Sequence, residues 1–410
     1  MQDNEKKPAL RFKGFTDPWE QRKVREVTDR YDNLRIPVAA SLRVAGTTPY
    51  YGANGIQDYV EGYTHDGEFI LVAEDGANDL KNYPVKCVKG RIWVNNHAHV
   101  LQGKCACADN QFLAYAISQA DIESLLVGGG RAKLNAETLM DIELLLPSKN
   151  EQIQIGHYLA RLDHLITLHQ RKYEKLVNIK KSMLDKMFPP NGASVPEIRF
   201  KGFTDPWEQR KLEDIANRVT RKNEGESDLP LTISSQYGLV DQRTFFNNQV
   251  ASKDMSGYYL LRKGEFAYNK STSGDSPWGA VKRLVRYEKG CVSTLYICFG
   301  LDGADPDFLV TYYETDRWYK AVQMIAAEGA RNHGLLNIAP NDFFDTALIL
   351  PPSREEQELI GLFFARLDNL ITLHQRKYDG CANPLFSERR ISCRKPSHQN
   401  RCSATTTPSG

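Results

Sequence analysis

Residues 11–23, RFKGFTDPWEQRK, recur without a change at residues 199–211. A second stretch, ARLDHLITLHQRKY at residues 160–173, recurs at residues 365–378, where Asn369 replaces His164 as the only difference. The copies lie 188 and 205 residues apart, which indicates a tandem duplication. The segments between them share almost no sequence. Identical ends around different middles predict a fixed scaffold that carries two variable modules, with specificity in the middles and assembly in the ends.

The second repeated stretch belongs to a long predicted helix. Ser148 and Glu151, and again Ser353 and Glu356, have the spacing of a capping box at a helix start. Apolar and aromatic residues follow at alternating steps of four and three, the heptad seam of a helix that packs lengthwise on another helix. The seam contains Ile155, Leu159, Leu162, Ile166, His169, Tyr173, Leu176, Lys180, Met183 and Met187, then Ile360, Phe364, Leu367, Ile371, His374 and Tyr378 in the second copy.

We predict that these two helices pair with each other, although an ordinary core helix would show a similar stripe. His169 and His374 lie on the seam, and we expect them to be packed rather than to bind a metal. After Tyr378 the apolar period stops, and the counterpart of residues 176–187 is missing. We therefore expect a second helix shortened by two turns or more and an irregular tail.

Each middle segment reads as a mixed α/β module with short strands. Strand composition occurs at 69–73, 91–94 and 98–101 in the first module and at 231–234, 265–268 and 291–297 in the second. Helical spacing occurs at residues 112–126 and 308–326. A glycine-rich loop follows each helix, at residues 128–134 and 329–334. Glycine beside basic or amide side chains lets a backbone approach DNA, but an ordinary exposed turn looks the same.

Composition leaves the partner open. The net charge of +2 is small for a protein that neutralises many phosphates alone, so either the charge is segregated onto one face or a partner protein supplies much of the phosphate contact. No apolar run is long enough to span a membrane, and the polar N-terminus lacks a secretory signal, which favours the cytoplasm. The eight cysteines show no disulfide-scaffold spacing and are expected to be reduced thiols.

Motifs for chemistry are weak or missing in the sequence. Cys87, His97, His99, Cys105 and Cys107 match no standard zinc spacing, so we expect no metal. We find no phosphate-binding loop and no nucleophile elbow. Residues 79–81 form a D-x-K triplet, which chance often produces. Residues 383–386, NPLF, approach a methyltransferase motif but lack its cofactor-binding half.

The repeated elements resemble the specificity subunit of Type I restriction–modification systems. The resemblance rests on GFTDPW at 14–19 and 202–207, on the segments that begin at Pro147 and Pro352, and on the RLD triplets at 161–163 and 366–368. The loop YYGANG at residues 50–55 is also similar to the first segment of these recognition domains. The match extends to Tyr378, and the tail departs from it.

The resemblance implies an α+β fold with two target recognition domains, each followed by a long helix. The helices would pair as an antiparallel coiled coil with pseudo-two-fold symmetry. The expected boundaries are 1–146 and 191–350 for the recognition domains, 147–190 and 351–379 for the helices, and 380–410 for the tail.

The resemblance also implies a function: recognition of a bipartite, asymmetric DNA target without catalysis. Two methyltransferase subunits would bring S-adenosylmethionine and methylate adenine, and a restriction subunit would bring ATP and Mg²⁺. Helix-seam residues for assembly would be Ile155, Leu159, Leu162, Ile166, Tyr173, Leu176, Phe364, Leu367, Ile371 and Tyr378. Loop residues that we expect to contact DNA are Tyr50, Tyr51, Asn54, Arg131, Lys133, Gln236, Lys270, Lys282, Arg331 and Asn332.

Two other functions remain open at this point. A DNA methyltransferase or nuclease with its own recognition domain would bind S-adenosylmethionine or metal as an isolated chain. A coiled-coil adaptor without DNA contact would show no sequence-dependent gel shift, with or without a methyltransferase partner.

Overall fold

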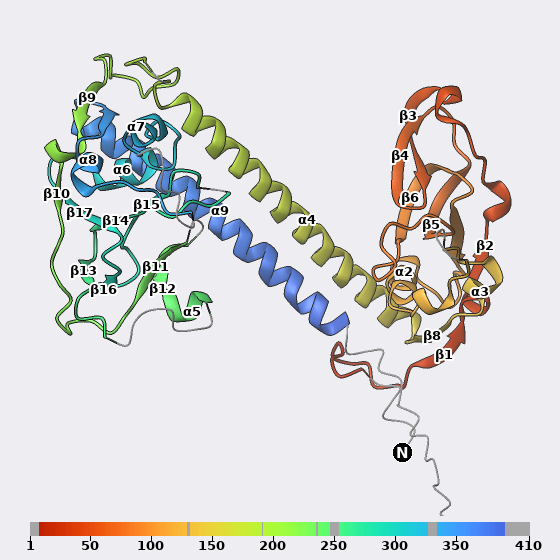
Figure 1. The fold of residues 1–410 in the computed structure, drawn as a ribbon. Coiled ribbons are helices and arrows are strands. Elements are labelled where there is room, and N and C mark those ends of the chain that lie inside the picture. Colours follow the sequence, from red (N-terminus) through yellow and green to blue (C-terminus); the bar gives the residue numbers. More distant parts are fainter. Residues whose placement is uncertain are drawn as a thin grey trace, which may run out of the picture. The chain divides into compact units, whose positions relative to one another are not determined.

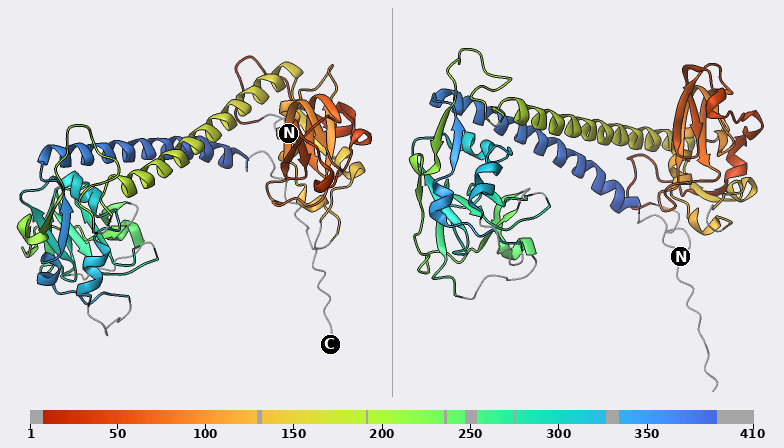
Figure 2. Two further views of the ribbon diagram at one scale, coloured as in Figure 1. Left: turned by 90° about the horizontal axis from the view of Figure 1, so that it is seen from above. Right: turned by 45° about the horizontal axis from the view of Figure 1, so that its top comes forward.

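The computed structural model describes residues 8–128, 132–190, 192–234, 237–246, 254–274, 276–326 and 334–389, with side chains as far as Gly380. The chain divides into two compact units (Figures 1 and 2). Unit 1 comprises Met1–His169 and Arg376–Gly410, and unit 2 comprises Gln170–Gln375. Each unit therefore contains one variable module and a part of both long helices. Among the described residues, no helix is long and apolar enough to cross a membrane.

Unit 1 contains a six-stranded sheet in the order β2-β7-β5-β6-β3-β4. All neighbours are antiparallel except β3 and β6, which are parallel. Ile70 and Val72 face a core shared with helix α2, whereas Phe69 and Leu71, one residue out of step, face a second apolar cluster. The elements are α1 (Val24–Val27), β2 (Thr28–Arg30), η1 (Asp32–Leu34), η2 (Ala40–Leu42), β3 (Ala45–Gly52), β4 (Gly55–Val60), β5 (His65–Ala73), β6 (Val85–Val94), β7 (Ala98–Gly103), α2 (Asn110–Ser118), η3 (Glu123–Leu125) and α3 (Ala136–Met140).

The three strands predicted in the first module are confirmed as parts of β5, β6 and β7. The helix predicted over residues 112–126 is too long, because α2 ends at Ser118. There the Ser118 hydroxyl donates to the carbonyl of Tyr115 at 2.8 Å, a local hydrogen bond that competes with helix continuation.

Unit 2 contains a four-stranded antiparallel sheet, β10-β17-β14-β15, and the paired strands β11-β12 and β13-β16. Its core is strongly aromatic: Phe266 stacks on Phe299 and Tyr268 stacks on Phe343, with ring centroids 5.2 and 4.4 Å apart. The elements are η4 (Leu212–Asp214), β10 (Ala216–Arg218), β11 (Leu231–Ser234), β12 (Gly238–Asp241), α5 (Gln242–Phe246), β13 (Tyr259–Arg262), β14 (Phe266–Asn269), β15 (Ala280–Arg283), β16 (Lys289–Val292), β17 (Ile297–Leu301), α6 (Pro306–Tyr312), α7 (Tyr319–Ile325) and α8 (Pro340–Phe344).

Two predictions for the second module are wrong in extent. The single strand expected over residues 291–297 is split into β16 and β17 by a turn in which the Tyr296 N–H donates to the Ser293 carbonyl at 3.1 Å. The helix expected over residues 308–326 is split into α6 and α7. Between them the Thr315 hydroxyl donates to the Tyr312 carbonyl at 2.6 Å and replaces a helical bond.

A two-stranded ribbon connects the start and end of each module. In unit 1, β1 (Glu20–Lys23) pairs with β8 (Glu143–Leu146), and in unit 2, β9 (Glu208–Lys211) pairs with β18 (Ala347–Leu350). The registers are equivalent, because Glu20 faces Leu146 and Glu208 faces Leu350.

A buried ion pair lies where each long helix begins. The Arg11 guanidinium donates two hydrogen bonds to the Glu151 carboxylate, at 2.7 and 2.8 Å, and Arg199 makes the same pair with Glu356 at the same distances. Both glutamate side chains are fully buried. The expected capping box is therefore only half formed: in the second copy the Ser353 hydroxyl accepts from the Glu356 N–H at 3.4 Å, but the glutamate carboxylates pair with the repeated N-terminal segment instead.

The next residue of each helix holds a short helix of the module. The Gln152 side-chain oxygen accepts from the Asp109 N–H, and Gln357 accepts from Asp305 in the same way, at 3.1 and 2.9 Å. Asp109 and Asp305 are the N-caps of α2 and α6. The glutamine therefore links the long helix directly to the start of the short one.

A glycine permits this close approach in both copies. A Cβ at Gly156 would lie 2.9 Å from the Phe112 nitrogen, and a Cβ at Gly361 would lie 2.7 Å from the Phe308 nitrogen. The repeated tryptophans pack on the same short helices, Trp19 on Phe112 and Trp207 on Phe308. We call these shared contacts the joint, which consists of Arg11, Trp19, Asp109, Phe112, Glu151, Gln152 and Gly156 in unit 1 and Arg199, Trp207, Asp305, Phe308, Glu356, Gln357 and Gly361 in unit 2.

The two long helices are α4 (Lys149–Lys186) and α9 (Arg354–Arg389). The seam residues of α4 from Leu159 to Met183 are all half-buried, which agrees with the predicted stripe. In unit 2, Leu176, Ile179 and Met183 pack against a core that contains Phe364 and Leu367 of α9. The two helices are thus in contact within this unit.

The expected end of the second helix at residue 379 is wrong. Helix α9 continues to Arg389, so it has 36 residues against 38 for α4. Gly380 is not among the glycines with positive φ, and a glycine in a helix costs about 1 kcal/mol without ending it. The helical backbone therefore continues past the point where the apolar period stops. The rest of the expected tail, residues 390–410, lies outside the described residues.

Candidate nucleic-acid interface

Three loops of unit 1 meet: the turn between β3 and β4, the end of the glycine-rich loop, and residues 74–78, which follow strand β5. Asn54, on the exposed turn between β3 and β4, donates to the Gly76 carbonyl at 2.9 Å and accepts from the Asn78 N–H at 3.0 Å. The Leu134 N–H, just after the glycine-rich loop, donates to the Glu74 carbonyl at 2.7 Å. The structure therefore brings together two predicted loop sites that are about eighty residues apart in the sequence.

The glycine-rich loop begins and ends in one short ladder. Val127 and Lys133 exchange both backbone hydrogen bonds, at 3.0 and 2.9 Å. Gly128 has a φ of 101°, a conformation that L side chains rarely adopt, so glycine is required there. Arg131, one of the predicted DNA contacts, lies between these ends and outside the described residues.

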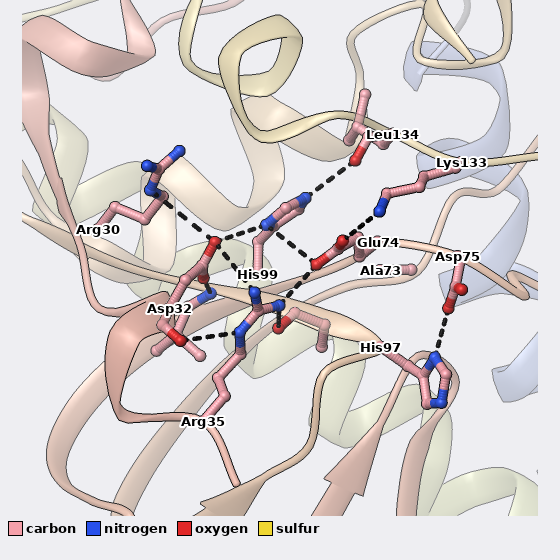
Figure 3. A network of polar contacts seen from close by, with 12 residues as sticks. Arg30, Asp32, Arg35, Ala73, Glu74, Asp75, His97, His99, Lys133 and Leu134 are labelled. Carbon is pink, nitrogen blue, oxygen red and sulfur yellow. Dashed lines mark hydrogen bonds and ion pairs between the residues drawn. The ribbon is translucent and has the colours of Figure 1, made fainter. Parts of the chain in front are cut away.

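A buried histidine anchors the end of this loop (Figure 3). His99 Nδ1 lies 2.8 Å from Asp32 Oδ2, and Nε2 lies 2.9 Å from the Leu134 carbonyl oxygen. A carbonyl only accepts, so Nε2 donates, and donation from Nδ1 as well requires the doubly protonated ring. The ring thereby links strand β7 to the chain that leaves the loop.

Glu74 makes the second half of the anchor. Its carboxylate accepts from Arg35 at 2.6 Å and from the Lys133 ammonium at 2.8 Å, as Figure 3 shows. We call Asp32, Arg35, Glu74, His99 and Lys133 the ion cluster. Lys133, predicted to contact DNA, is therefore paired within the protein, and its position is fixed by the cluster.

Both carboxylates of the ion cluster ionise more readily than usual. Burial raises the pKa of Asp32, but the hydrogen bond from His99 and the charge of Arg35 help to bring it below its ordinary value of 3.8. Burial likewise raises the pKa of Glu74, and hydrogen bonds from Lys133 and Arg35 bring it below 4.5. Asp32 and Glu74 are thus ionised at neutral pH.

The ion cluster could not be recognised in the sequence. Three of its residues are far apart in the chain: Asp32 lies in η1, His99 lies in β7, and Glu74 follows β5. In the sequence, His99 stands out only as a possible metal ligand. No local spacing joins the three residues, because the sheet alone brings them together.

Tyr50 and Tyr51 are wrong as predicted DNA contacts. Their exposed fractions are 1% and 7%, so they belong to the core of the sheet. The Tyr50 hydroxyl accepts from the Val38 N–H at 3.0 Å, a buried use of the polar tip that the sequence did not indicate. Of the YYGANG loop, Asn54 remains exposed.

In unit 2 the predicted lysines contact their own module. The Lys270 ammonium donates to the Ile338 carbonyl at 3.3 Å, and burial lowers its pKa. Lys282 lies 3.9 Å from Glu314, with 20% of its side chain exposed. Neither lysine extends freely from a loop. Gln236, Arg331 and Asn332, the other predicted contacts, lie outside the described residues.

Among the residues that the structure describes, the second glycine-rich loop is held by Thr272 and backbone bonds rather than by a carboxylate cluster. After the loop, the Gly334 carbonyl accepts from both the N–H and the hydroxyl of Thr272, at 2.7 and 3.0 Å. The Leu336 N–H donates to the Lys270 carbonyl at 3.0 Å. The same place in the two modules is therefore held by different chemistry.

The histidines and cysteines weighed as metal ligands have separate surroundings. His97 Nδ1 lies 2.5 Å from Asp75 and His99 bonds to Asp32, so the two rings use different carboxylates. Burial raises the pKa of the Cys87 thiol to about 12, whereas Cys105 and Cys107 are exposed. The described residues contain no group of three or more such side chains that could hold a metal ion.

Known proteins share both the sequence and the architecture. A putative type I restriction enzyme specificity subunit from Haemophilus influenzae is 41% identical over 379 residues, which cover 85% of this chain and 88% of that protein. The chain belongs to the type I specificity subunits. Residues 16–178 of this specificity subunit also match the family described as the Type I restriction modification DNA specificity domain.

More distant relatives extend the comparison. The specificity subunit of the type I restriction enzyme EcoprrI from Escherichia coli is 26% identical over 117 residues, 28% of each chain. The solved S subunit of a type I restriction–modification system from M. genitalium has 12% identity and a TM-score of 0.61, over 94% of this chain and 98% of that one. It shows that the two proteins share a fold.

Membership assigns the protein a role. A specificity subunit is not catalytic and acts with other restriction–modification subunits on DNA. The three convergent loops of unit 1 and the corresponding loop of unit 2 are therefore the candidate DNA interface of this specificity subunit.

Proposed function

We propose that each unit of this specificity subunit reads one half of a bipartite, asymmetric DNA target. The observation that carries the proposal is that the joint occurs in both units with the same contacts, although the two units have different sheets. Two modules that share the joint but differ in their loops would suit the reading of two different half-sites. Because the loops are anchored differently, the two half-sites should differ in sequence.

The long helices have the second role in this proposal. They pair as an antiparallel coiled coil with pseudo-two-fold symmetry, set the spacing of the half-sites and dock two methyltransferase subunits. The half-buried heptad seam of α4 supports the pairing, as does the ion pair between Lys180 of α4 and Asp368 of α9 within unit 2. Half-sites about one helical turn of DNA apart, roughly 34 Å, would suit such helices.

The chemistry then belongs to the partners. The methyltransferase subunits bring S-adenosylmethionine and methylate adenine, and a restriction subunit brings ATP and Mg²⁺. The net charge of +2 supports shared DNA binding, because a complex can supply the phosphate contacts that this chain lacks. Such a complex would work in the cytoplasm, where it meets genomic DNA.

Asn54 and the glycine-rich loops provide the base contacts in this proposal. Their candidate residues are Asn54 and Arg131 in unit 1 and Gln236, Arg331 and Asn332 in unit 2. Amide and guanidinium side chains can bond to base edges in pairs, which gives sequence discrimination.

A methylation map of the full complex tests the function. The chain is expressed with its methyltransferase partner in a host without adenine methylation, and methylated adenines are mapped across the genome. One asymmetric split motif is expected. Methylation without a split motif would overturn the bipartite reading.

Gel shifts separate the remaining alternatives. Weak binding by the chain alone and tight, sequence-dependent binding with the methyltransferase are expected at about 0.15 M salt. A complex that forms but never discriminates between DNA sequences would identify the chain as a structural adaptor.

A further inference from the structure

Unit 1 has an open groove of about 890 Å³ along helix α2. One wall is a face of α2 that includes Gln111, Ala114 and Ser118, and another is Ala160 and Asp163 of α4. Residues 80–87, which lead into β6, form the third side. The groove belongs wholly to unit 1 and lies apart from the ion cluster.

The equivalent surface of unit 2 is covered. The joint aligns α2 with α6 and Asp163 with Asp368, as the repeat requires. There Lys180 of α4 lies 2.6 Å from Asp368 and 2.7 Å from Glu314, which follows α6. Burial lowers the pKa of Lys180, but these carboxylates raise it above its ordinary value of 10.5.

Apolar contacts accompany this ion pair in unit 2. Leu176, Ile179 and Met183, at positions i, i+3 and i+7 of α4, pack against the core that α6 and α9 build. Lys180, at i+4, projects between them toward the two carboxylates. This segment of α4 is thus an amphipathic helix with one central lysine, seated on the short helix of the module.

The second copy cannot supply the same segment to unit 1. Cys381, Pro384 and Leu385 occupy the positions of Leu176, Ile179 and Lys180 in the repeat. In unit 1, Asp163 instead accepts from the Tyr115 hydroxyl at 2.5 Å. Within the described part of the chain, the residues that line the groove come from positions 80–163.

We propose that this groove is a docking site for an amphipathic helix of another protein chain, one with apolar residues at i, i+3 and i+7 and a lysine at i+4. The site would complete in trans what unit 2 completes in cis. Charge supports this occupant. The groove is lined by Asp121, Glu123 and Asp163 against Lys81 and Lys86, whereas residues 174–187 carry four lysines and two acids. The proposal is independent of DNA reading.

A labelled peptide with the sequence of residues 174–187 tests the site on the full chain. Micromolar binding is expected by fluorescence anisotropy, with one peptide per chain. Asp163→Lys should weaken the binding of this peptide at least tenfold. A peptide that carries Lys180→Glu should bind that variant again, because the reversed charge pair is complementary. Absence of binding, or binding indifferent to both charge changes, would overturn the proposal.

A chimera distinguishes the groove from other surfaces. Replacing residues 379–392 by the sequence of residues 174–187 supplies the missing segment in cis, so the chimera should no longer bind the peptide. A chimera that binds the peptide as the parent does would place the peptide elsewhere and contradict the site. Displacement of the peptide from the parent by a short DNA duplex would identify DNA as the occupant and also refute the proposal.

Discussion

The two joints are alike, whereas the two glycine-rich loops are anchored differently. Arg11 and Glu151 repeat the geometry of Arg199 and Glu356, with the same two hydrogen-bond distances of 2.7 and 2.8 Å. The loop of unit 1 is anchored by His99 and the four charged residues around it, but the loop of unit 2 is anchored by Thr272 and backbone bonds. After the duplication, the contacts of the joint stayed the same, whereas the contacts that hold the loops changed.

The largest effect expected from this comparison is at the joint. Arg199→Met leaves the fully buried Glu356 carboxylate without its partner, which should cost about 3–5 kcal/mol. Arg11→Met should cause an equal loss, confined to unit 1. Hydrogen exchange resolved by peptide should show lost protection in β9 and β18 for the first variant and in β1 and β8 for the second. Arg22→Met, which breaks an exposed pair with Glu20, is the control and should change neither.

The second largest effect is expected at the glycines of the joint. Gly361→Ala places a Cβ 2.7 Å from the Phe308 nitrogen, and the backbone must shift, at a cost of about 1–3 kcal/mol. Gly156→Ala, with its closest approach at 2.9 Å, should cost less. Gly380→Ala adds a methyl group to open space and should stabilise the helix slightly. Urea unfolding measures all three, and a stabilising Gly361→Ala would mean that the short helix is not held by this contact.

The sequence predicted the repeated parts of the molecule well because they are local or identical. Heptad spacing predicted the long helices, and the RFKGFTDPWEQRK repeat predicted a scaffold shared by both units. The predictions that failed concern residues whose partners are distant in the sequence, or a helix whose backbone continues past the end of its apolar stripe. Tyr50 is buried because Val38 accepts its hydroxyl tip, the ion cluster joins residues from several elements, and α9 continues through Gly380 because a helix needs hydrogen bonds more than an apolar stripe.

Loop anchoring should affect target choice in one half-site at a time. Glu74→Gln removes the charge that positions Lys133, so discrimination in the half-site read by unit 1 should fall about tenfold, at the low end of a paired base contact. Thr272→Val should do the same only in the other half-site. The measurement is the relative methylation of single-mismatch targets by the full complex.

Its control is Asp66→Asn, which breaks the exposed pair with Arg91 in the same unit and should leave discrimination unchanged. If Lys133 instead bound a phosphate, Glu74→Gln would free its ammonium group and tighten DNA binding. Tighter binding with unchanged discrimination would therefore contradict the positioning role of the ion cluster.

The smallest effect is expected from acidification, which should weaken the anchor of the unit 1 loop more than the anchor of the unit 2 loop. The pKa values of Asp32 and Glu74 are lowered in the folded chain, so their contribution is complete above their ordinary values of 3.8 and 4.5 and is lost as the pH falls through the lowered ones. Amide exchange at Val127, Lys133 and Leu134, corrected for intrinsic rates from about pH 6 to about pH 3, should lose about fivefold in protection, the equivalent of roughly 1 kcal/mol. Thr272 and Leu336 donate to carbonyl oxygens that do not titrate, so their protection should fall less. Equal losses in both loops would mean that global acid unfolding, rather than the ion cluster, governs the loop of unit 1.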